Sequence, residues 1–316
     1  MRNQRKLITF ILLIFLSNIV VFGTINKTEK KSFNVNFGGK LFVETDKGSI
    51  LIKSHSAETI EVELFLKIKT DDEDIAQKIL NDFEVEFDQS GSNLNIIAKY
   101  KGSKNWIGNI FGGNKSNKLN VKFEITVPEK YNVDLNTSGG GIQVDDLIGW
   151  IEANTSGGGL TFGNITGDIN GKTSGGGITV GKCDGDIDIK TSGGGIDINK
   201  CKGSVKANTS GGGIKVKEVY GTINASTSGG SVFASILEQP MENCSLTTSG
   251  GGITVKLADN IKVDLDAKTS GGSVNTDFPI TIQGKVERSK LEGVINGGGP
   301  DLYLRSSGGS INIEKN

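Results

Sequence analysis

Short runs of alternating apolar and polar residues recur throughout the second half of the chain. One run follows each cluster of glycines, as at Ile178 and Val180, and a second run precedes the next cluster, as at Ile187 and Ile189. A period of two places every second side chain on the same face of a β-strand. Each unit of the pattern is therefore predicted to form two strands that each bury one face.

The glycine clusters belong to a repeat that opens with Thr-Ser-Gly-Gly. Its first six copies start 18 residues apart and two more follow at intervals of 21, so that the copies begin at Thr137, Thr155, Thr173, Thr191, Thr209, Thr227, Thr248 and Thr269. A variant copy starts at Ser306, 37 residues later, which is close to two units, and insertions near Pro279 and Pro300 are expected to interrupt the stack. Eighteen residues are too few for a β-α-β crossover or for a propeller blade. The chain is therefore predicted to be all-β, a β-solenoid of about 18-residue rungs, right-handed according to crossover chirality.

Glycine accounts for 46 of the 316 residues, whereas proline accounts for 4. A sharp corner needs positive φ or a close approach between backbones, and glycine permits both. The structural corners are predicted at the first two glycines of the first six copies: Gly139, Gly140, Gly157, Gly158, Gly175, Gly176, Gly193, Gly194, Gly211, Gly212, Gly229 and Gly230. The threonine that opens each copy is in phase with the buried positions. We expect it to point inward and to hydrogen-bond a neighbouring rung or a corner amide.

The region before the repeat is also rich in predicted strands. Residues 33–136 alternate in several runs, and Asp71–Asp74 provide the acidic first turn of one short predicted helix. The segment 41–52 matches the repeating unit in phase, so this region is predicted to continue the solenoid and to cap its N-terminal end. The predicted organisation is a signal peptide at 1–23, a linker at 24–32, a β-rich cap at 33–136 and the repeat solenoid at 137–316.

The first residues have the pattern of an export signal. Arg2, Arg5 and Lys6 precede an apolar stretch from Leu7 to Phe22, and a cleavage site is expected after Gly23. The alternative is an uncleaved membrane anchor, because the stretch is near the lower length limit for a membrane span. The protein is accordingly expected in the periplasm, at the cell surface or outside the cell.

The sequence offers few residues for catalysis or metal binding, with one His and three Cys. A net charge of −1 argues against nucleic-acid binding. Cys183 and Cys201 occupy the same position in adjacent rungs, which permits either a disulfide or two stacked buried thiols. Asp184, Asp186 and Asp188 form the densest acidic spot, interpreted as a solvated corner rather than a weak Ca²⁺ site. No metal and no cofactor are predicted.

Two stretches present aromatic residues that could meet a partner. Residues 101–118 form a Gly/Asn/Lys/Ser-rich loop that contains Trp106 and Phe111. These side chains are candidates for contact with a partner or a membrane, and the alternative is that the loop folds back over the end of the solenoid. Trp150 is expected at an outward position, as an isolated contact for a sugar or another partner.

Three segments resemble a known family. They are Gly39–Lys53, Phe123–Pro128 and Val133–Ile142, the last with its glycine-rich copies, and they are similar to the bacterial "putative adhesin" domain family. The resemblance covers about residues 33–316, and its Thr-Ser-Gly-Gly motif is specific for the architecture rather than for a function. It implies a glycine-rich β-strand-repeat domain and brings no catalytic residues with it.

These observations favour an exported, non-enzymatic repeat protein that presents a binding surface to an unknown cell-surface or envelope component. The alternative is a structural envelope scaffold that self-assembles by strand pairing at an exposed end rung. A lower alternative is a polysaccharide-acting β-helix enzyme, which needs carboxylates that converge on its outer face. The outward positions of the repeat are mixed in character and do not converge.

Overall fold

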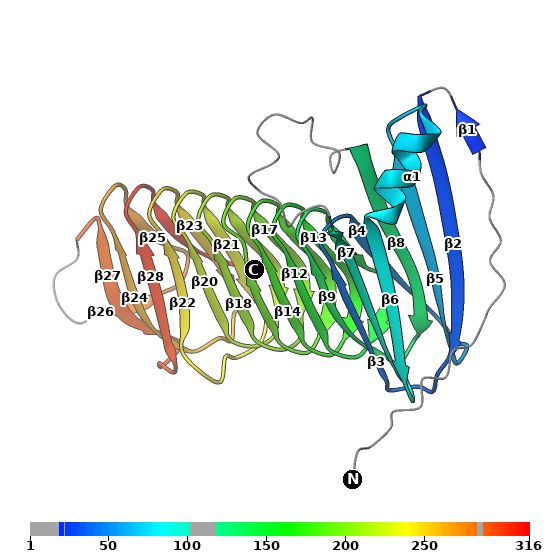
Figure 1. Ribbon diagram of the computed structural model, residues 1–316. Coiled ribbons are helices and arrows are strands. Elements are labelled where there is room, and N and C mark those ends of the chain that lie inside the picture. The colour runs from blue at the N-terminus through cyan, green and yellow to red at the C-terminus, as the bar shows by residue number, and fades with distance from the viewer. Residues whose placement is uncertain (1–18, 22, 102–117, 283–286) are drawn as a thin grey trace, which may run out of the picture.

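The computed structural model describes residues 19–21, 23–101, 118–282 and 287–316. It shows an elongated stack of short strands, with longer strands and one helix at its N-terminal end (Figure 1). The predicted signal peptide up to residue 18, as well as Trp106 and Phe111, lie outside the described residues. The all-β, solenoid-like prediction is confirmed, since two long sheets run along the whole stack.

The two sheets face each other across the core. Sheet A has the spatial order β1 (Ile19–Val21), β2 (Thr24–Asn34), β5 (Thr59–Ile68), β8 (Leu119–Pro128), β4 (Ser49–His55), β10 (Ile142–Val144), β13 (Leu160–Thr166), β15 (Ile178–Asp184), β17 (Ile196–Cys201), β19 (Ile214–Val219), β21 (Val232–Ile236), β23 (Ile253–Leu257), β29 (Ile311–Lys315) and β25 (Val274–Thr276), with β11 (Leu147–Ile148) paired to β13. Sheet B has the order β26 (Ile280–Ile282), β27 (Lys290–Ile295), β24 (Val263–Thr269), β28 (Asp301–Ser306), β22 (Cys244–Thr248), β20 (Ile223–Thr227), β18 (Val205–Thr209), β16 (Ile187–Lys190), β14 (Ile169–Thr173), β12 (Ile151–Thr155), β9 (Asn132–Thr137), β3 (Lys40–Thr45), β7 (Asn93–Tyr100) and β6 (Phe83–Ser90).

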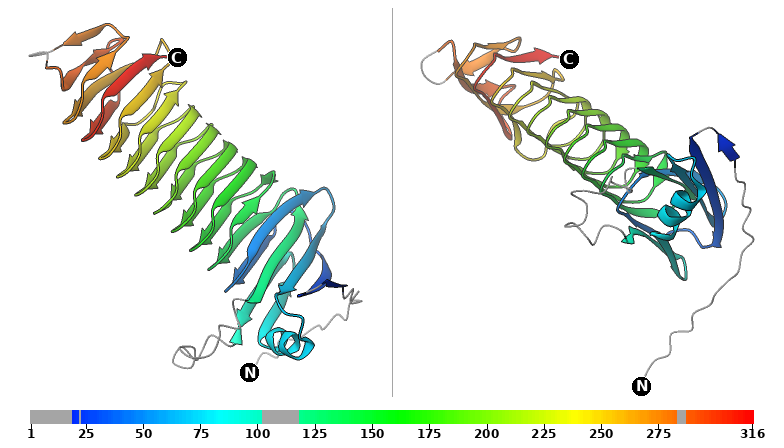
Figure 2. Two further views of the ribbon diagram at one scale, coloured as in Figure 1. Left: turned by 90° about the horizontal axis from the view of Figure 1, so that it is seen from above. Right: turned by 45° about the horizontal axis from the view of Figure 1, so that its top comes forward.

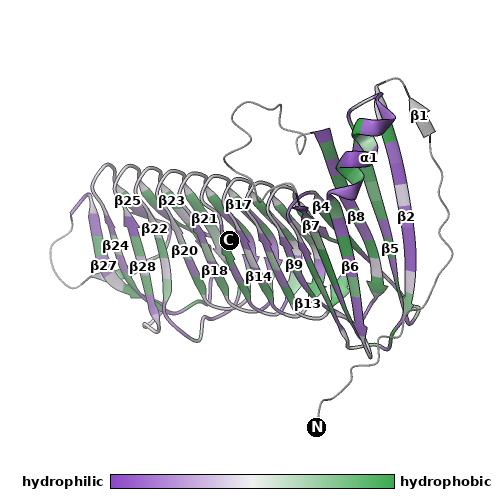
Figure 3. Cartoon of the chain, in the orientation of Figure 1, coloured by the Kyte–Doolittle hydropathy of each residue, from purple (hydrophilic) through white to green (hydrophobic). Residues whose placement is uncertain are grey.

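Each repeat contributes one strand to each sheet, and equivalent residues pair in parallel. Ile151 pairs with Ile169 in sheet B and Leu160 pairs with Ile178 in sheet A, in both cases with a partner 18 residues away. Apolar residues alternate with polar ones along these strands (Figure 3). The apolar positions form one continuous core between the sheets, so the buried face of each rung rests on the same face of the next.

The stack begins earlier in the chain than residue 137. Strand β3 pairs with β9 so that Thr45 lies beside Thr137, and β4 pairs with β10. The in-phase match of segment 41–52 is therefore present as a rung. Antiparallel strands β2, β5 and β8 continue sheet A, and β6 and β7 continue sheet B. The predicted helix is present as α1 (Glu73–Asn81), which begins at the N-cap Asp72.

The expected linker at 24–32 is wrong. These residues lie within β2, which pairs antiparallel with β5 over ten residues, from Ile25 with Ile68 to Asn34 with Thr59. The segment lacks the apolar alternation of the other strands, and its side chains are accordingly mostly only partly buried. Its backbone hydrogen bonds to β5, rather than a buried side-chain face, make it a strand.

The last rung lies out of sequence order. Strand β28 is inserted between β22 and β24, and β29 is inserted between β23 and β25 (Figure 2). The expectation that Ser306 follows Thr269 by about two units is therefore wrong, because Ser306 lies between Thr248 and Thr269. Strands β26 and β27 form an antiparallel hairpin on the far side of β24.

Candidate binding surface

The corner glycines are explained by close packing between rungs. A Cβ built on Gly158 would lie 2.3 Å from the amide nitrogen of Gly141, and one on Gly176 would lie 2.4 Å from that of Gly159. Neither glycine has positive φ; in this part of the repeat positive φ occurs at the second corner, at Gly149 and Gly167. Close approach, and not left-handed backbone, is thus the reason for glycine at these two positions of the first corner.

The threonine that opens each repeat points inward and ties neighbouring corners together. Thr155 donates to the carbonyl oxygen of Gly140 at 2.6 Å, and Thr173 donates to that of Gly158 at the same distance. The Thr155 hydroxyl also accepts from the amide of Gly158 at 3.4 Å. This column therefore belongs to the core and leaves the outer faces free for other chemistry.

Cys183 and Cys201 are Cα partners in β15 and β17, and both thiols are free and buried. Each sulfur donates to a corner carbonyl oxygen, Cys183 to Gly167 at 3.4 Å and Cys201 to Gly185 at 3.4 Å. The neighbouring Cys201 sulfur and burial both raise the pKa of the Cys183 thiol. The pair therefore lies in the core, away from any outer surface.

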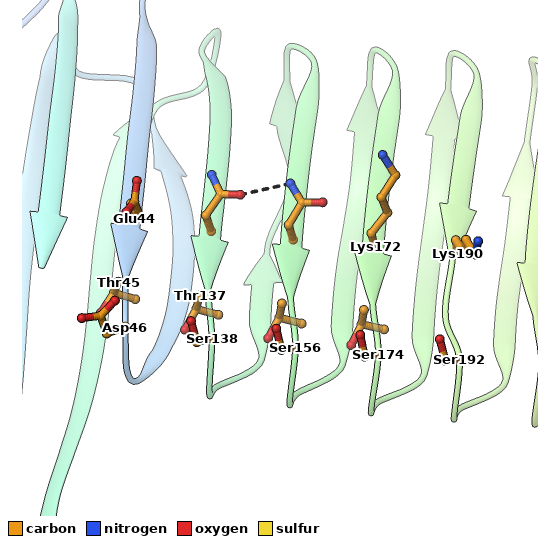
Figure 4. A pocket seen from close by; sticks show the side chains of 14 residues that line it. Glu44, Thr45, Asp46, Thr137, Ser138, Ser156, Lys172, Ser174, Lys190 and Ser192 are labelled. Atoms are coloured by element: carbon orange, nitrogen blue, oxygen red, sulfur yellow. Dashed lines mark hydrogen bonds between the residues drawn. The ribbon is translucent and has the colours of Figure 1, made fainter. Parts of the chain in front are cut away.

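The outer face of sheet B carries two shallow grooves. The first, of about 360 Å³, runs along the strand ends next to the Ser-Gly-Gly corners. Figure 4 shows its serines in a row, one from each rung: Ser138, Ser156, Ser174 and Ser192. Beside them lie Glu44, Lys172 and Lys190, together with Asn136 and Asn154, whose amide groups are joined by a hydrogen bond of 3.1 Å. This groove is polar and repeats its groups at the rung spacing of about 4.8 Å.

The second groove, of about 440 Å³, lies where the strands of sheet B begin, and Trp150 stands at one end of it. Trp150 is 39% exposed, as the sequence led us to expect of an outward position. Two other large apolar side chains, Phe37 (42% exposed) and Ile148 (43%), lie on the same corner, because the segments 37–39, 130–132 and 148–150 are hydrogen-bonded side by side. An exposed apolar cluster of this kind marks an interaction site more often than isolated apolar residues do.

Beyond Trp150 the second groove is lined by carboxylates and amides from successive rungs. The carboxylates and amides are Glu152, Asp168, Asn170, Asp186, Asp188 and Asn224, and the Lys206 ammonium lies among them. On the near side, the Lys40 ammonium lies 5.0 Å from the centre of the Trp150 ring and forms an ion pair with Asp134 at 2.8 Å. The groove therefore combines one aromatic surface with hydrogen-bonding groups spaced along the stack.

The carboxylates at the acidic corner are occupied by their neighbours. Asp186 accepts from the amide of Ser204 at 2.7 Å, and Asp184 and Asp188 form ion pairs with Lys202 and Lys206. In the described ranges 19–21, 23–101, 118–282 and 287–316, no three His, Cys, Asp or Glu side chains come together to hold a metal ion.

A similar contact between rungs occurs at Asp146, two rungs nearer the N-terminal end than Asp186. The Asp146 carboxylate accepts from the amide nitrogen and the side chain of Asn164, and these hydrogen bonds lower the pKa of Asp146. The sequence did not single out Asp146 for this contact between rungs, although Asn164 lies 18 residues further on, at the spacing of the repeat. Nor did it single out Phe37 and Ile148, since neither has a repeated counterpart.

The chain belongs to the Toastrack DUF4097 family, whose profile matches residues 39–314. A search of curated proteins gives no match. Within the described part of the chain, no helix is both long and apolar enough to cross a membrane.

Several solved structures are similar over most of their length. One is titled a "putative adhesin" from Bacteroides fragilis, with 14% identity, a TM-score of 0.40, and coverage of 92% of this chain and 97% of that chain. Another is titled a "putative lipid binding protein" from Parabacteroides distasonis, with 14% identity, a TM-score of 0.37, and coverage of 92% and 96%. A third, a "putative cell adhesion protein" from Clostridium sporogenes, has 15% identity, a TM-score of 0.24, and coverage of 92% and 100%.

Proposed function

We propose that this protein is an exported, non-enzymatic binding protein whose second groove on sheet B docks a cell-surface or envelope component. The observation that carries the proposal is Trp150, exposed at one end of a groove lined by polar side chains, with the exposed Phe37 and Ile148 on adjoining segments of the same corner. An aromatic anchor with adjacent hydrogen-bonding groups is the usual composition of a recognition site. The groove crosses several rungs, so it suits an extended ligand.

Two features support the non-enzymatic part of the proposal. Catalytic carboxylates work when their environments drive their pKa values apart or leave them poised near the substrate. Here Asp188 is paired with Lys206, and Asp186 binds the backbone of the next rung. These contacts give the carboxylates a role in joining rungs.

Export is supported by the basic and apolar start of the sequence, from Arg2 to Phe22. Stacking of whole solenoids through their ends has less support. At one end the hairpin of β26 and β27 covers the last rung of sheet B, and at the other end the stack is extended by α1 and the antiparallel strands. We therefore favour a side surface over an end surface.

Binding of the exported form to isolated envelope fractions tests the proposal. Trp150→Ala is expected to weaken binding about tenfold or more, since loss of an aromatic anchor costs about 2 kcal/mol. Tyr303→Ala is the matched control, because Tyr303 is 40% exposed on the same sheet but lies near its far end. If both variants lose binding equally, or if both retain it equally, the binding site lies elsewhere. No binding by the unaltered protein would reject the function itself.

A further inference from the structure

The final rung, defined as β28 and β29 with their connecting corner (Asp301–Lys315), occupies a slot between two rungs that precede it in the sequence. In sheet B, Leu302 lies beside both Cys244 and Leu265. In sheet A, Ile311 lies beside both Ile253 and Val274. All of these pairings are parallel, so the final rung fits the slot as an ordinary member of the stack.

The slot holds the final rung by repeat contacts and by contacts of its own. The Ser306 hydroxyl donates to the carbonyl oxygen of Gly251 at 2.7 Å, in the manner of the threonine column. Asn243 and Asp301 exchange two hydrogen bonds, of 3.0 and 2.9 Å. Arg305 forms an ion pair with Asp266 on the opposite wall. Four apolar side chains of the rung are buried: Leu302, Leu304, Ile311 and Ile313.

The two walls of the slot carry matching patterns and could pair with each other directly. Thr227 and Thr248 lie 21 residues apart in the sequence and on adjacent rungs. Thr248 and Thr269 are also 21 residues apart, yet the final rung lies between them. A separation of 21 residues therefore joins either two adjacent rungs or two rungs with one other rung between them. Release of the final rung would therefore leave two walls that either pair with each other or stay open for another final rung, and the rest of the stack would stay paired.

The segment 296–300 links the final rung to the rest of the stack. Among the residues that the structure describes, Asn296 is the one non-glycine residue with positive φ, at 54°. Gly297 and Gly298 follow with φ of 93° and 86°, and the Asn296 side chain donates to the carbonyl oxygens of Asp259 and Ile261. Asparagine and glycine adopt this left-handed backbone readily, so the segment makes a short, sharp hinge, and short hinges favour exchange of the element that they carry.

We propose that the final rung is exchangeable and that the slot also binds the final rung of a second copy of this chain, which gives a reciprocally swapped dimer. A released rung exposes four apolar side chains and unpaired strand edges, which need a partner. The slot of another copy offers the same registers and the same Asn243, Gly251 and Asp266 contacts. Exchange of identical elements needs no new interface. This inference goes beyond the binding groove, which lies on other rungs.

The test uses the full chain with its three native cysteines replaced (Cys183→Ala, Cys201→Ala and Cys244→Ala), and the control pair uses the same background. Two variants then carry one introduced cysteine each, Thr254→Cys or Asn312→Cys. These two residues are Cα partners on β23 and β29, the first in the slot wall and the second in the final rung. The variants are mixed, partly unfolded, refolded together and oxidised. In a swapped dimer the introduced thiol of one variant faces that of the other, so a covalent heterodimer is expected. While most of the protein is monomeric, a tenfold rise in protein concentration should raise the ratio of dimer to monomer about tenfold by mass action.

The matched control is the mixture of Thr161→Cys and Thr179→Cys, which are Cα partners on β13 and β15. Both positions lie in the body of one chain, so no covalent heterodimer is expected from this pair. Light scattering must give twice the monomer mass for the swapped species. The proposal is overturned if the slot mixture stays monomeric at every concentration, or if the control mixture cross-links equally.

Discussion

The Thr191 hydroxyl lies 2.6 Å from the carbonyl oxygen of Gly176, and this hydrogen bond joins one corner of the stack to the next. Thr191 is fully buried, and its oxygen also accepts from the amide of Gly194 at 3.4 Å. Equivalent bonds occur at Thr209 and Thr227. The Thr191 and Thr227 side chains thus each satisfy a backbone donor and a backbone acceptor that the strand ladders do not use.

Replacing Thr191 with valine keeps the shape of the side chain and removes its hydroxyl. The carbonyl oxygen of Gly176 then loses this partner, so the free energy of unfolding is expected to fall by about 1–3 kcal/mol. Chemical denaturation of the variant measures the change. Thr179→Val is the control, because Thr179 points outward and is exposed. Equal stability of the two variants would contradict a structural role for the inward column.

A second prediction concerns the corner glycines. In Gly176→Ala the new Cβ meets backbone atoms of the preceding rung at 2.4–2.5 Å, and backbone cannot turn aside as a side chain can. The loss of stability is expected to reach about 1–3 kcal/mol or more. Gly139→Ala places its Cβ where no atom lies within 4 Å, and it should leave the melting temperature nearly unchanged. If both variants melt alike, close approach is not the reason for glycine.

Most of the stack was predictable because its pattern is local and repeated. The alternation around Ile187 and Ile196 specifies which side chains are buried, and the recurrence of Thr-Ser-Gly-Gly aligns the rungs. The place of the final rung was not predictable for the same reason. Since the copies at Thr248, Thr269 and Ser306 present equivalent strands, nothing local specifies which copy pairs with which.

The candidate groove was predictable only in part. The outward position of Trp150 follows from strand alternation, but its neighbourhood depends on the cap. Phe37 comes from a segment about a hundred residues earlier, which becomes adjacent because β3 starts the stack beside β9. Such non-repeated contacts leave no periodic signal in the sequence.

A third prediction tests the inward and outward assignment within one strand. Ile187 is 2% exposed, and in Ile187→Asp a carboxylate without a partner is buried, at an expected cost of more than about 4 kcal/mol. Because each rung depends on its neighbours, this variant is expected to open several rungs around β16, and limited proteolysis is expected to cleave the chain there. Asp188→Ala removes an exposed ion pair with Lys206 and should cost less than about 1 kcal/mol. Similar protease sensitivity of the two variants would contradict the assignment of Ile187 to the core and of Asp188 to the outer face.

A fourth prediction concerns the three cysteines, which are all free and buried. Cys183 and Cys201 have Cα atoms about 4.8 Å apart by sheet spacing, which is close enough for a disulfide. Thiol titration separates the two states, since three thiols should react after denaturation if none is paired and one should react if a disulfide has formed. We expect three, because the same position holds Leu147, Ile165 and Val219 in other rungs and is filled by core packing alone.

In the native protein these thiols should react slowly even at pH 9. The thiolate is the reactive form, and the pKa of Cys183 is raised by the Cys201 sulfur and by burial, while burial raises that of Cys244. Raising the pH toward the ordinary thiol pKa therefore produces little thiolate at Cys183 and Cys244. The hydrogen bond with Cys183 lowers the pKa of Cys201, so burial alone protects that thiol, and reaction at all three sites waits for local opening of the stack. The added thiol of Thr179→Cys, at an exposed position, should react within the mixing time and shows that the reagent is active. Fast native reaction of the wild-type protein would mean that the rungs around β15 and β17 open far more often than their continuous packing allows.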